Sequence, residues 1–274
     1  MNNFQLSRAP FVTSSMPRAR ACALIVALFS TIASAESPPR ETFLGYDIVA
    51  TYAHDEHAFT QGLALLNGEI VESRGMFGAS AVTIGEIQSG VARRRHDVAR
   101  QYFAEGLAVG GGRIVQLTWR SGVAFVYDTK LKPLGELHYE GEGWGLTFDG
   151  TQWLMSDGSD RIVARKLDDF SVARELHVTD RGVPVRQLNE LEYARGRLYA
   201  NIWHSDRIAV IDPSSGLVEA WLDLSALRGG FMKPPAWDEN EHVLNGIAYN
   251  PRSGHFYVTG KCWPVLFEIA LKGG

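Results

Sequence analysis

This chain of 274 residues contains an internal repeat, and two ionisable residues, Glu105 and Lys261, stand at positions that the repeat brings to the same end of its units. A carboxylate can take up and return a proton, and a lysine can donate to negative charge that develops during a reaction. Aromatic rings and amides at the corresponding positions of other repeats can exclude water and add hydrogen bonds. A single acid and a single lysine in such company are unusual for a purely structural position. The amide and aromatic positions are Gln61, Asn189, Trp119, Trp144 and Trp203.

A triplet that recurs five times brings these residues into register. The central residues of the triplets lie 44, 39, 45 and 56 positions apart, and a second β-rich segment ends 13 to 16 residues after each triplet begins. A period in the forties with several short strands per unit is typical of a β-propeller. The triplets are Gln61-Gly62-Leu63, Glu105-Gly106-Leu107, Trp144-Gly145-Leu146, Asn189-Glu190-Leu191 and Asn245-Gly246-Ile247.

Each repeat is expected to form four short strands separated by turns. The fifth repeat ends after the strand expected at 265–271, where too few residues remain for a fourth strand. The segment 46–52 precedes the first triplet as the other fourth strands precede theirs. We therefore predict an all-β protein, a five-bladed β-propeller whose ring is closed by the N-terminal strand completing the last blade. An insertion at 226–242 explains the long last spacing, and loops of this length are often functional.

The repeat also predicts which side chains meet at one end of the central channel. The first residue of each triplet should begin an innermost strand, and the offset of 13 to 16 residues returns the chain to the same end. Phe59 and Phe103, each two residues before a triplet, should add apolar walls. The ring expected at this end consists of Gln61, Glu105, Trp144, Asn189 and Asn245, surrounded by Trp119, Asp157, Trp203 and Lys261.

The first 35 residues have the pattern of a secretory signal. Arg18 and Arg20 precede an apolar run over 21–32, which ends in Ala33-Ser34-Ala35, a small-x-small cleavage pattern. The run is shorter than the roughly 20 apolar residues that span a membrane. We predict removal of 1–35, export to the periplasm or the exterior, and a single catalytic domain over 36–274. Met16 is an alternative start of the signal.

Composition limits the partners and cofactors of the mature chain. Three arginines leave with the signal, so 27 − 3 = 24 basic residues face 31 acidic ones, a net charge near −7. This balance argues against nucleic acid as a partner, and we expect a monomer without a membrane anchor after cleavage. Cys262 becomes the only cysteine, so an internal disulfide cannot form. HExxH and CxxC spacings do not occur, so we expect no dedicated zinc site.

Motifs in all five repeats resemble the plant-type glutaminyl-peptide cyclotransferases, over roughly residues 42–271. The resemblance implies a five-bladed propeller that converts N-terminal glutamine of peptides or proteins to pyroglutamate and releases ammonia. It allows a structural calcium ion in the channel, with no cofactor required for catalysis. The motifs are the segment 54–63, Gly143-Trp144-Gly145-Leu146-Thr147, the segment 188–193, Leu244-Asn245-Gly246-Ile247-Ala248, Val258-Thr259-Gly260-Lys261 and Trp263-Pro264.

The resemblance also implies roles for residues at the predicted channel end. Glu105 corresponds to the acid, which would take the proton of the α-amine and return it to ammonia. The neighbouring polar groups correspond to Gln61, Asn189 and Lys261, and Lys261, Gln61 or an indole N–H could donate to the oxyanion. The aromatic cage corresponds to Trp119, Trp144 and Trp203, with Phe59 and Phe103 beside it.

Other interpretations stay open at this stage. A non-catalytic propeller could bind peptide termini or small ligands in the same pocket, and a calcium-dependent lactonase-type propeller would need more converging carboxylates. Asp157 and Asn245 could simply cap turns, and Glu190 and Glu192 are expected to be strand or loop charges rather than catalysts. The remaining tryptophans are expected in the core: Trp153, Trp221, Trp237 and Trp263.

Overall fold

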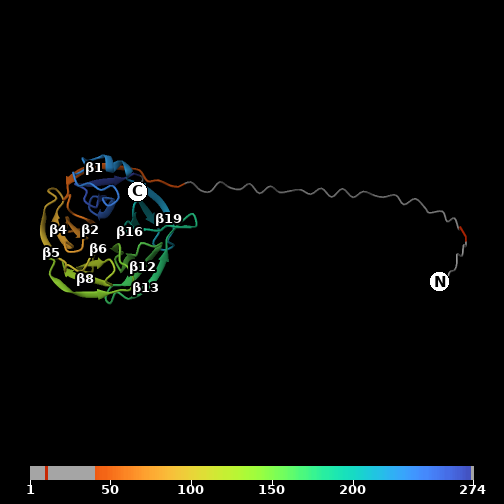
Figure 1. The fold of residues 1–274 in the computed structure, drawn as a ribbon, viewed down its shortest axis with the longest axis horizontal. Coiled ribbons are helices and arrows are strands. Elements are labelled where there is room, and N and C mark those ends of the chain that lie inside the picture. The colour runs from red at the N-terminus through yellow and green to blue at the C-terminus, as the bar shows by residue number, and fades with distance from the viewer. Residues whose placement is uncertain (1–9, 12–40, 273–274) are drawn as a thin grey trace, which may run out of the picture. The chain divides into compact units, whose positions relative to one another are not determined.

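The computed structural model describes residues 10–11 and 41–272, and all that follows concerns the second of these ranges. Its strands form five four-stranded antiparallel sheets arranged as blades around a centre (Figure 1). The predicted all-β, five-bladed propeller is therefore confirmed. The predicted signal segment 1–35 lies outside the described residues apart from 10 and 11. In the described part of the chain no helix has the length and apolar character needed to cross a membrane.

The first three blades follow one another without interruption, each running from the channel outward in chain order. Their strands are β2 (Thr60–Leu66), β3 (Glu69–Arg74), β4 (Ala81–Glu86) and β5 (Ala92–Asp97) in blade 1, β6 (Ala104–Gly110), β7 (Arg113–Thr118), β8 (Val123–Asp128) and β9 (Pro133–His138) in blade 2, and β10 (Leu146–Phe148), β11 (Gln152–Ser156), β12 (Arg161–Lys166) and β13 (Val172–His177) in blade 3.

Blades 4 and 5 carry the additions to the basic plan. A two-stranded hairpin precedes blade 4, and a short 3₁₀ helix begins the insertion between blades 4 and 5. These elements are the hairpin β14 (Thr179–Asp180) and β15 (Val183–Pro184), blade 4 with β16 (Leu188–Ala194), β17 (Arg197–Ile202), β18 (Arg207–Ile211) and β19 (Val218–Asp223), the helix η1 (Ser225–Gly229), and the C-terminal strands β20 (Leu244–Asn250), β21 (His255–Gly260) and β22 (Val265–Leu271).

The N-terminal strand β1 (Tyr46–Ala53) is the outermost strand of blade 5. It pairs antiparallel with β22, from Tyr46 opposite Leu271 to Ala53 opposite Val265. The two ends of the described range are thus joined by a ladder of backbone hydrogen bonds, as predicted. Closure leaves only short, protected sheet edges, which limits pairing with another chain.

Four of the five triplets coincide with an irregularity in the innermost strand. The register shifts between Thr60 and Gly62 in β2, and between Ala104 and Leu107 in β6. The same shift occurs at 188–191 in β16 and at 244–247 in β20. A β-bulge bends its strand and redirects the side chain of the extra residue. The first residue of these triplets is therefore turned out of the regular ladder.

The central glycines of the triplets are required because neighbouring blades approach closely. A Cβ added to Gly62 would lie 2.5 Å from the backbone nitrogen of Leu107, and one added to Gly145 would lie 2.0 Å from the carbonyl oxygen of Asn189. Side chains essentially never tolerate contacts this short with backbone. The repeated glycine is thus a packing requirement of the channel wall.

Apolar clusters fill the spaces between adjacent blades. The largest joins residues of blades 4 and 5, and the partly buried Trp237 of the insertion packs against it. Trp153 and Trp263 are completely buried, and Trp221 is 9% exposed. These four tryptophans thus pack in or against the core, as expected.

Candidate active site

A cavity of about 840 Å³ lies at the end of the channel where the innermost strands begin. Equivalent backbone hydrogen bonds of 2.9 Å occur at this end in three blades. The N–H groups of Trp119, Trp203 and Lys261 donate to the carbonyl oxygens of Phe103, Gln187 and Val243, respectively. The residue after the second strand is thus held beside the start of the first. The structure brings all nine predicted site residues to the cavity wall: Phe59, Gln61, Phe103, Glu105, Trp119, Trp144, Asn189, Trp203 and Lys261.

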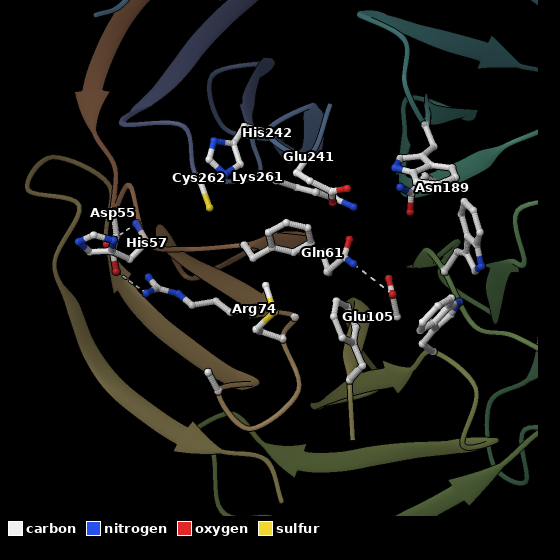
Figure 2. Close-up of a pocket in the computed structure, with 18 of the residues that line it drawn as sticks. Asp55, His57, Gln61, Arg74, Glu105, Asn189, Glu241, His242, Lys261 and Cys262 are labelled. Atoms are coloured by element: carbon white, nitrogen blue, oxygen red, sulfur yellow. Dashed lines mark hydrogen bonds and ion pairs between the residues drawn. The ribbon is translucent and has the colours of Figure 1, made fainter. Parts of the chain in front are cut away.

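Glu105 is the carboxylate at the deep part of this wall, and only 6% of it is exposed. The side-chain amide of Gln61 donates to its Oε1 at 3.1 Å (Figure 2). Burial raises the pKa of Glu105 well above its usual range, Lys261 opposes this shift, and the charge of Glu142 adds to it. A glutamate with a raised pKa is a stronger base in its ionised form, which suits proton transfer near neutral pH.

Lys261 follows β21 and is 5% exposed. Its ammonium lies 4.8 Å from the centre of the Phe59 ring, a distance compatible with a cation–π contact. Burial lowers the pKa of Lys261, whereas the nearby carboxylates of Glu105 and Glu241 raise it. Within residues 41–272 no direct ion pair joins Lys261 to Glu105, so the ammonium is not neutralised by a contact partner.

The aromatic walls form two contacting groups. The ring of Phe103 meets Phe59 and Trp119 edge to face, with centroids 6.2 and 5.9 Å away. The rings of Trp144 and Trp203 meet at 87° with centroids 5.4 Å apart. The indole N–H groups of Trp119 and Trp144 both donate to the carboxylate of Glu142. These two N–H groups are therefore already engaged by a carboxylate of the protein.

Two asparagines at triplet positions have different surroundings. Asn189 lines the cavity, is 2% exposed, and its Oδ1 has no hydrogen-bond partner. Asn245 is fully buried, and its Nδ2 donates to Oε1 of Gln61 at 3.2 Å and to the carbonyl oxygen of Thr60 at 3.0 Å. Asn245 thus orients the amide of Gln61 rather than forming the cavity wall. In the sequence, Asn245 was singled out only by its position as the first residue of a triplet.

Asp157, which the repeat placed around the channel end, does not line the cavity. Its carboxylate closes its own turn by accepting from the backbone N–H of Ser159 and pairs with Arg161 at 2.7 Å. The turn-capping alternative therefore describes this residue. The triplet of blade 3 also begins two residues before β10, so Trp144 precedes its strand rather than starting it.

Glu190 replaces the triplet glycine in blade 4 and is completely buried. Its two carboxylate oxygens accept hydrogen bonds from the backbone N–H groups of Leu63 in blade 1 and Ile247 in blade 5. The side chain therefore joins three blades across the channel. Burial raises the pKa of Glu190 well above its usual range, and the two N–H donors oppose this shift. The sequence pattern predicted a strand charge here, but not its burial or its partners.

Two further cavity-lining features come from outside the predicted set. The insertion contributes Asp238, Glu241 and His242 to the cavity lining, and Glu241 is close enough for its charge to act on Lys261 (Figure 2). Cys262 also lines the cavity, and burial raises the pKa of its thiol to about 11. The thiol is therefore protonated at neutral pH and is a poor nucleophile.

The fold and the cavity define the class of protein: a five-bladed β-propeller with a buried acid and a buried lysine in an aromatic cavity. The chain belongs to the glutamine cyclotransferase family: the model of the family described as "Glutamine cyclotransferase" matches residues 21–271. A glutaminyl-peptide cyclotransferase from Arabidopsis thaliana is 37% identical over 231 residues, covering 82% of this chain and 71% of that protein. The crystal structure of Myxococcus xanthus glutaminyl cyclase has a TM-score of 0.78 and 37% identity, and the match covers 85% of this chain and 98% of that one.

Proposed function

We propose that the chain converts the N-terminal glutamine of peptides or proteins to pyroglutamate, with Glu105 as the proton-transfer group. The observation that carries this proposal is the nearly buried Glu105 carboxylate, held by Gln61 beside Lys261 in an aromatic cavity. The family to which the chain belongs supports the reaction. A propeller that only binds neutral ligands would have little need for both a buried acid and a buried lysine.

The first step forms the ring. The neutral α-amine nitrogen attacks the γ-amide carbon of the same residue, and the carbonyl π electrons move to oxygen. The reference pKa of an α-amine is about 7.7–8.0, so a useful neutral fraction exists at mild pH. Glu105 as carboxylate takes the proton that the nitrogen loses. Because the attack is intramolecular, orientation in the cavity can supply an effective molarity of roughly 10⁵–10⁸ M.

The second step releases ammonia. Protonated Glu105 returns its proton to the amide nitrogen, the carbon–nitrogen bond breaks, and the oxyanion reforms a carbonyl group. The products are the pyroglutamyl peptide and ammonia, and Glu105 is again a carboxylate. Acid–base assistance of this kind contributes about 10²–10⁴ in rate.

Lys261 is the donor that best suits the oxyanion. One amide N–H of Gln61 is directed to Glu105, and the indole N–H groups of Trp119 and Trp144 are directed to Glu142. The ammonium of Lys261 is buried at the cavity wall and has no contact ion pair among the described residues. A preorganised donor at an oxyanion contributes about 10²–10³ in rate.

The other cavity residues would bind and orient the substrate. The rings of Trp119, Trp144, Trp203, Phe59 and Phe103 would pack the glutamine methylenes and exclude water. The unpartnered Oδ1 of Asn189 could accept a hydrogen bond from the α-amine or the amide of the substrate. The rings are assigned from their place on the cavity wall, and Asn189 is assigned from its unpartnered oxygen.

If a structural calcium ion binds in the channel, we propose that backbone oxygens hold it. No group of three or more His, Cys, Asp or Glu side chains gathers for a metal in the described range. The two channel carboxylates of Glu190 and Glu192 point their oxygens at N–H and O–H donors. The side chains thus do not fit a calcium site, and no catalytic step is assigned to the ion.

Mass spectrometry of a glutamine-initiated peptide tests the function. We expect the mature chain over 36–274 to release one ammonia per peptide, and a chelator to leave the rate unchanged. A folded protein that binds the peptide without ammonia loss would favour the non-catalytic propeller, and loss of the rate with chelator would assign the metal a role. Export after removal of 1–35 is part of the proposal and is tested by N-terminal sequencing of the exported chain.

A further inference from the structure

Glu142 lies in the loop between β9 and β10 and is not among the described residues that line the cavity. Nevertheless, its Oε2 contacts two walls of the cavity. It accepts the indole N–H of Trp119 at 2.8 Å and that of Trp144 at 3.0 Å. These tryptophans belong to different blades, so one carboxylate oxygen bridges the second and third blades at the cavity.

The second oxygen of Glu142 extends this arrangement to Arg120. Oε1 accepts from Nε of Arg120 at 2.7 Å, and the guanidinium of Arg120 lies 3.7 Å from the centre of the Trp119 ring. Trp119 is thus held at its edge by Glu142 and on its face by Arg120. An exposed ion pair alone contributes little. Here the pair is combined with two charge-assisted hydrogen bonds to indoles, which are stronger than neutral ones.

Trp144 passes the constraint to the third tryptophan. Its ring meets Trp203 edge to face at 5.4 Å, and offset or edge contacts of this kind favour one relative orientation. The geometry points to Glu142 as a positioning residue that sets the orientation of Trp119 and Trp144, and thereby the shape of the glutamine-binding cavity. This inference rests on the proposed function, in which these rings bind the substrate.

Glu142 also acts on the proton-transfer group through its charge. Although partial burial favours its protonated form, hydrogen bonds from Trp144, Arg120 and Trp119 hold the pKa of Glu142 below its usual range. Its charge adds to the effect of burial in raising the pKa of Glu105. Orientation and charge can be separated, because glutamine keeps an acceptor oxygen at this position but not the charge.

The test compares Glu142→Ala, Glu142→Gln and the control Glu219→Gln. Glu219 is also paired with an arginine, Arg197, but both side chains are exposed and lie in blade 4. We expect Glu142→Ala to raise KM about tenfold, the loss of roughly one charge-assisted hydrogen bond. Glu142→Gln should keep KM within about threefold and move the acid limb of kcat/KM to lower pH, because Glu105 loses a negative neighbour. The control should change neither quantity.

A readout without turnover keeps this inference distinct from the proposed function. Acrylamide quenching of tryptophan fluorescence should increase in Glu142→Ala, because two indoles lose their anchor, but not in Glu142→Gln. If wild type fails to cyclise any glutamine peptide, the proposed function is contradicted, whereas the quenching result still tests the positioning role. The inference would be overturned if Glu142→Ala had the same KM, the same acid limb of kcat/KM and the same acrylamide quenching as wild type. A lower Tm in that variant, with these three quantities unchanged, would show a merely structural role and would overturn it too.

Discussion

Gln61 in blade 1 donates a hydrogen bond of 3.1 Å from its Nε2 to Oε1 of Glu105 in blade 2. The amide of Gln61 is itself held by Asn245 of blade 5, which donates to its Oε1 at 3.2 Å. The orientation of the proposed proton-transfer group therefore depends on amides from two other blades. One of these blades, blade 5, takes its outermost strand from the N-terminal segment β1.

Gln61→Leu removes this hydrogen bond while keeping a side chain of similar volume. Because the amide stabilises the ionised form of Glu105, its loss should raise the pKa of Glu105 further. Activity requires the carboxylate, so the acid limb of kcat/KM should move to higher pH, and the plateau should fall about tenfold. A pH–rate profile measures both. Gln61→Glu would not be a suitable control, since it adds a charge; the suitable control is Gln152→Leu, in the second strand of blade 3 and not among the residues that line the cavity.

Lys261→Met tests the proposed oxyanion donor. The change keeps the length of the side chain and removes its charge, so kcat should fall by about 10²–10³. The acid limb should also move to higher pH, because Lys261 lowers the pKa of Glu105. Lys261→Arg keeps the charge and should leave the acid limb in place. A Lys261→Met enzyme with wild-type kcat would remove this residue from the mechanism.

Gly145→Ala tests the packing requirement of the channel wall. The new methyl group would lie 2.0 Å from the carbonyl oxygen of Asn189, so blades 3 and 4 would have to separate. Overpacking of this kind costs about 1–3 kcal/mol or more in the free energy of unfolding. The matched control is Gly229→Ala, where a Cβ meets nothing within 4 Å. In urea unfolding, the free energies of unfolding of the two variants should differ by at least about 1 kcal/mol. Equal midpoints would contradict the packing argument.

Glu192 in β16 should make stability depend on pH. Burial raises the pKa of Glu192 from 4.5 to about 8. The folded state then binds more protons than the unfolded state between these values, so this group lowers the free energy of unfolding as pH rises from about 4.5 to 8. Glu192→Gln should remove this contribution. Urea midpoints between pH 5 and 8 should therefore fall more steeply for wild type than for the variant; parallel slopes would contradict the shift.

The fold was predictable because its signal is repeated. The close approach at Gly62, Gly106 and Gly145 requires the same residue in successive blades, and that recurrence sets the register from which Glu105 and Lys261 were placed at one end of the channel. The strand 46–52 was assigned to the last blade because the fifth repeat lacked a fourth strand. Each of these inferences needed only spacing along the chain.

Contacts between non-equivalent positions were not predictable in the same way. Glu142 stands two residues before its triplet, where the first two repeats carry Phe59 and Phe103, so the repeat does not reveal that a carboxylate there binds Trp119 and Trp144 of two blades. Glu190 was expected to be an ordinary strand charge, because alternation with Leu191 does not reveal that its side chain crosses the channel to Leu63 and Ile247. A place in the ring around the channel end and a turn cap were both open for Asp157; its carboxylate caps the turn that follows it, and the residue does not line the cavity.

Glu105→Gln tests the central claim most directly. The amide keeps the size of the side chain but cannot accept and return a proton, so kcat for ammonia release should fall by about 10²–10⁴. As the pH is lowered, wild type should lose activity at a pH well above the range in which a glutamate usually titrates, because the pKa of Glu105 is raised. Ammonia release and the pH–rate profile are measured for both proteins, with circular dichroism to show that the variant is folded. A folded Glu105→Gln protein that cyclises at the wild-type rate, with an unchanged acid limb, would contradict the account.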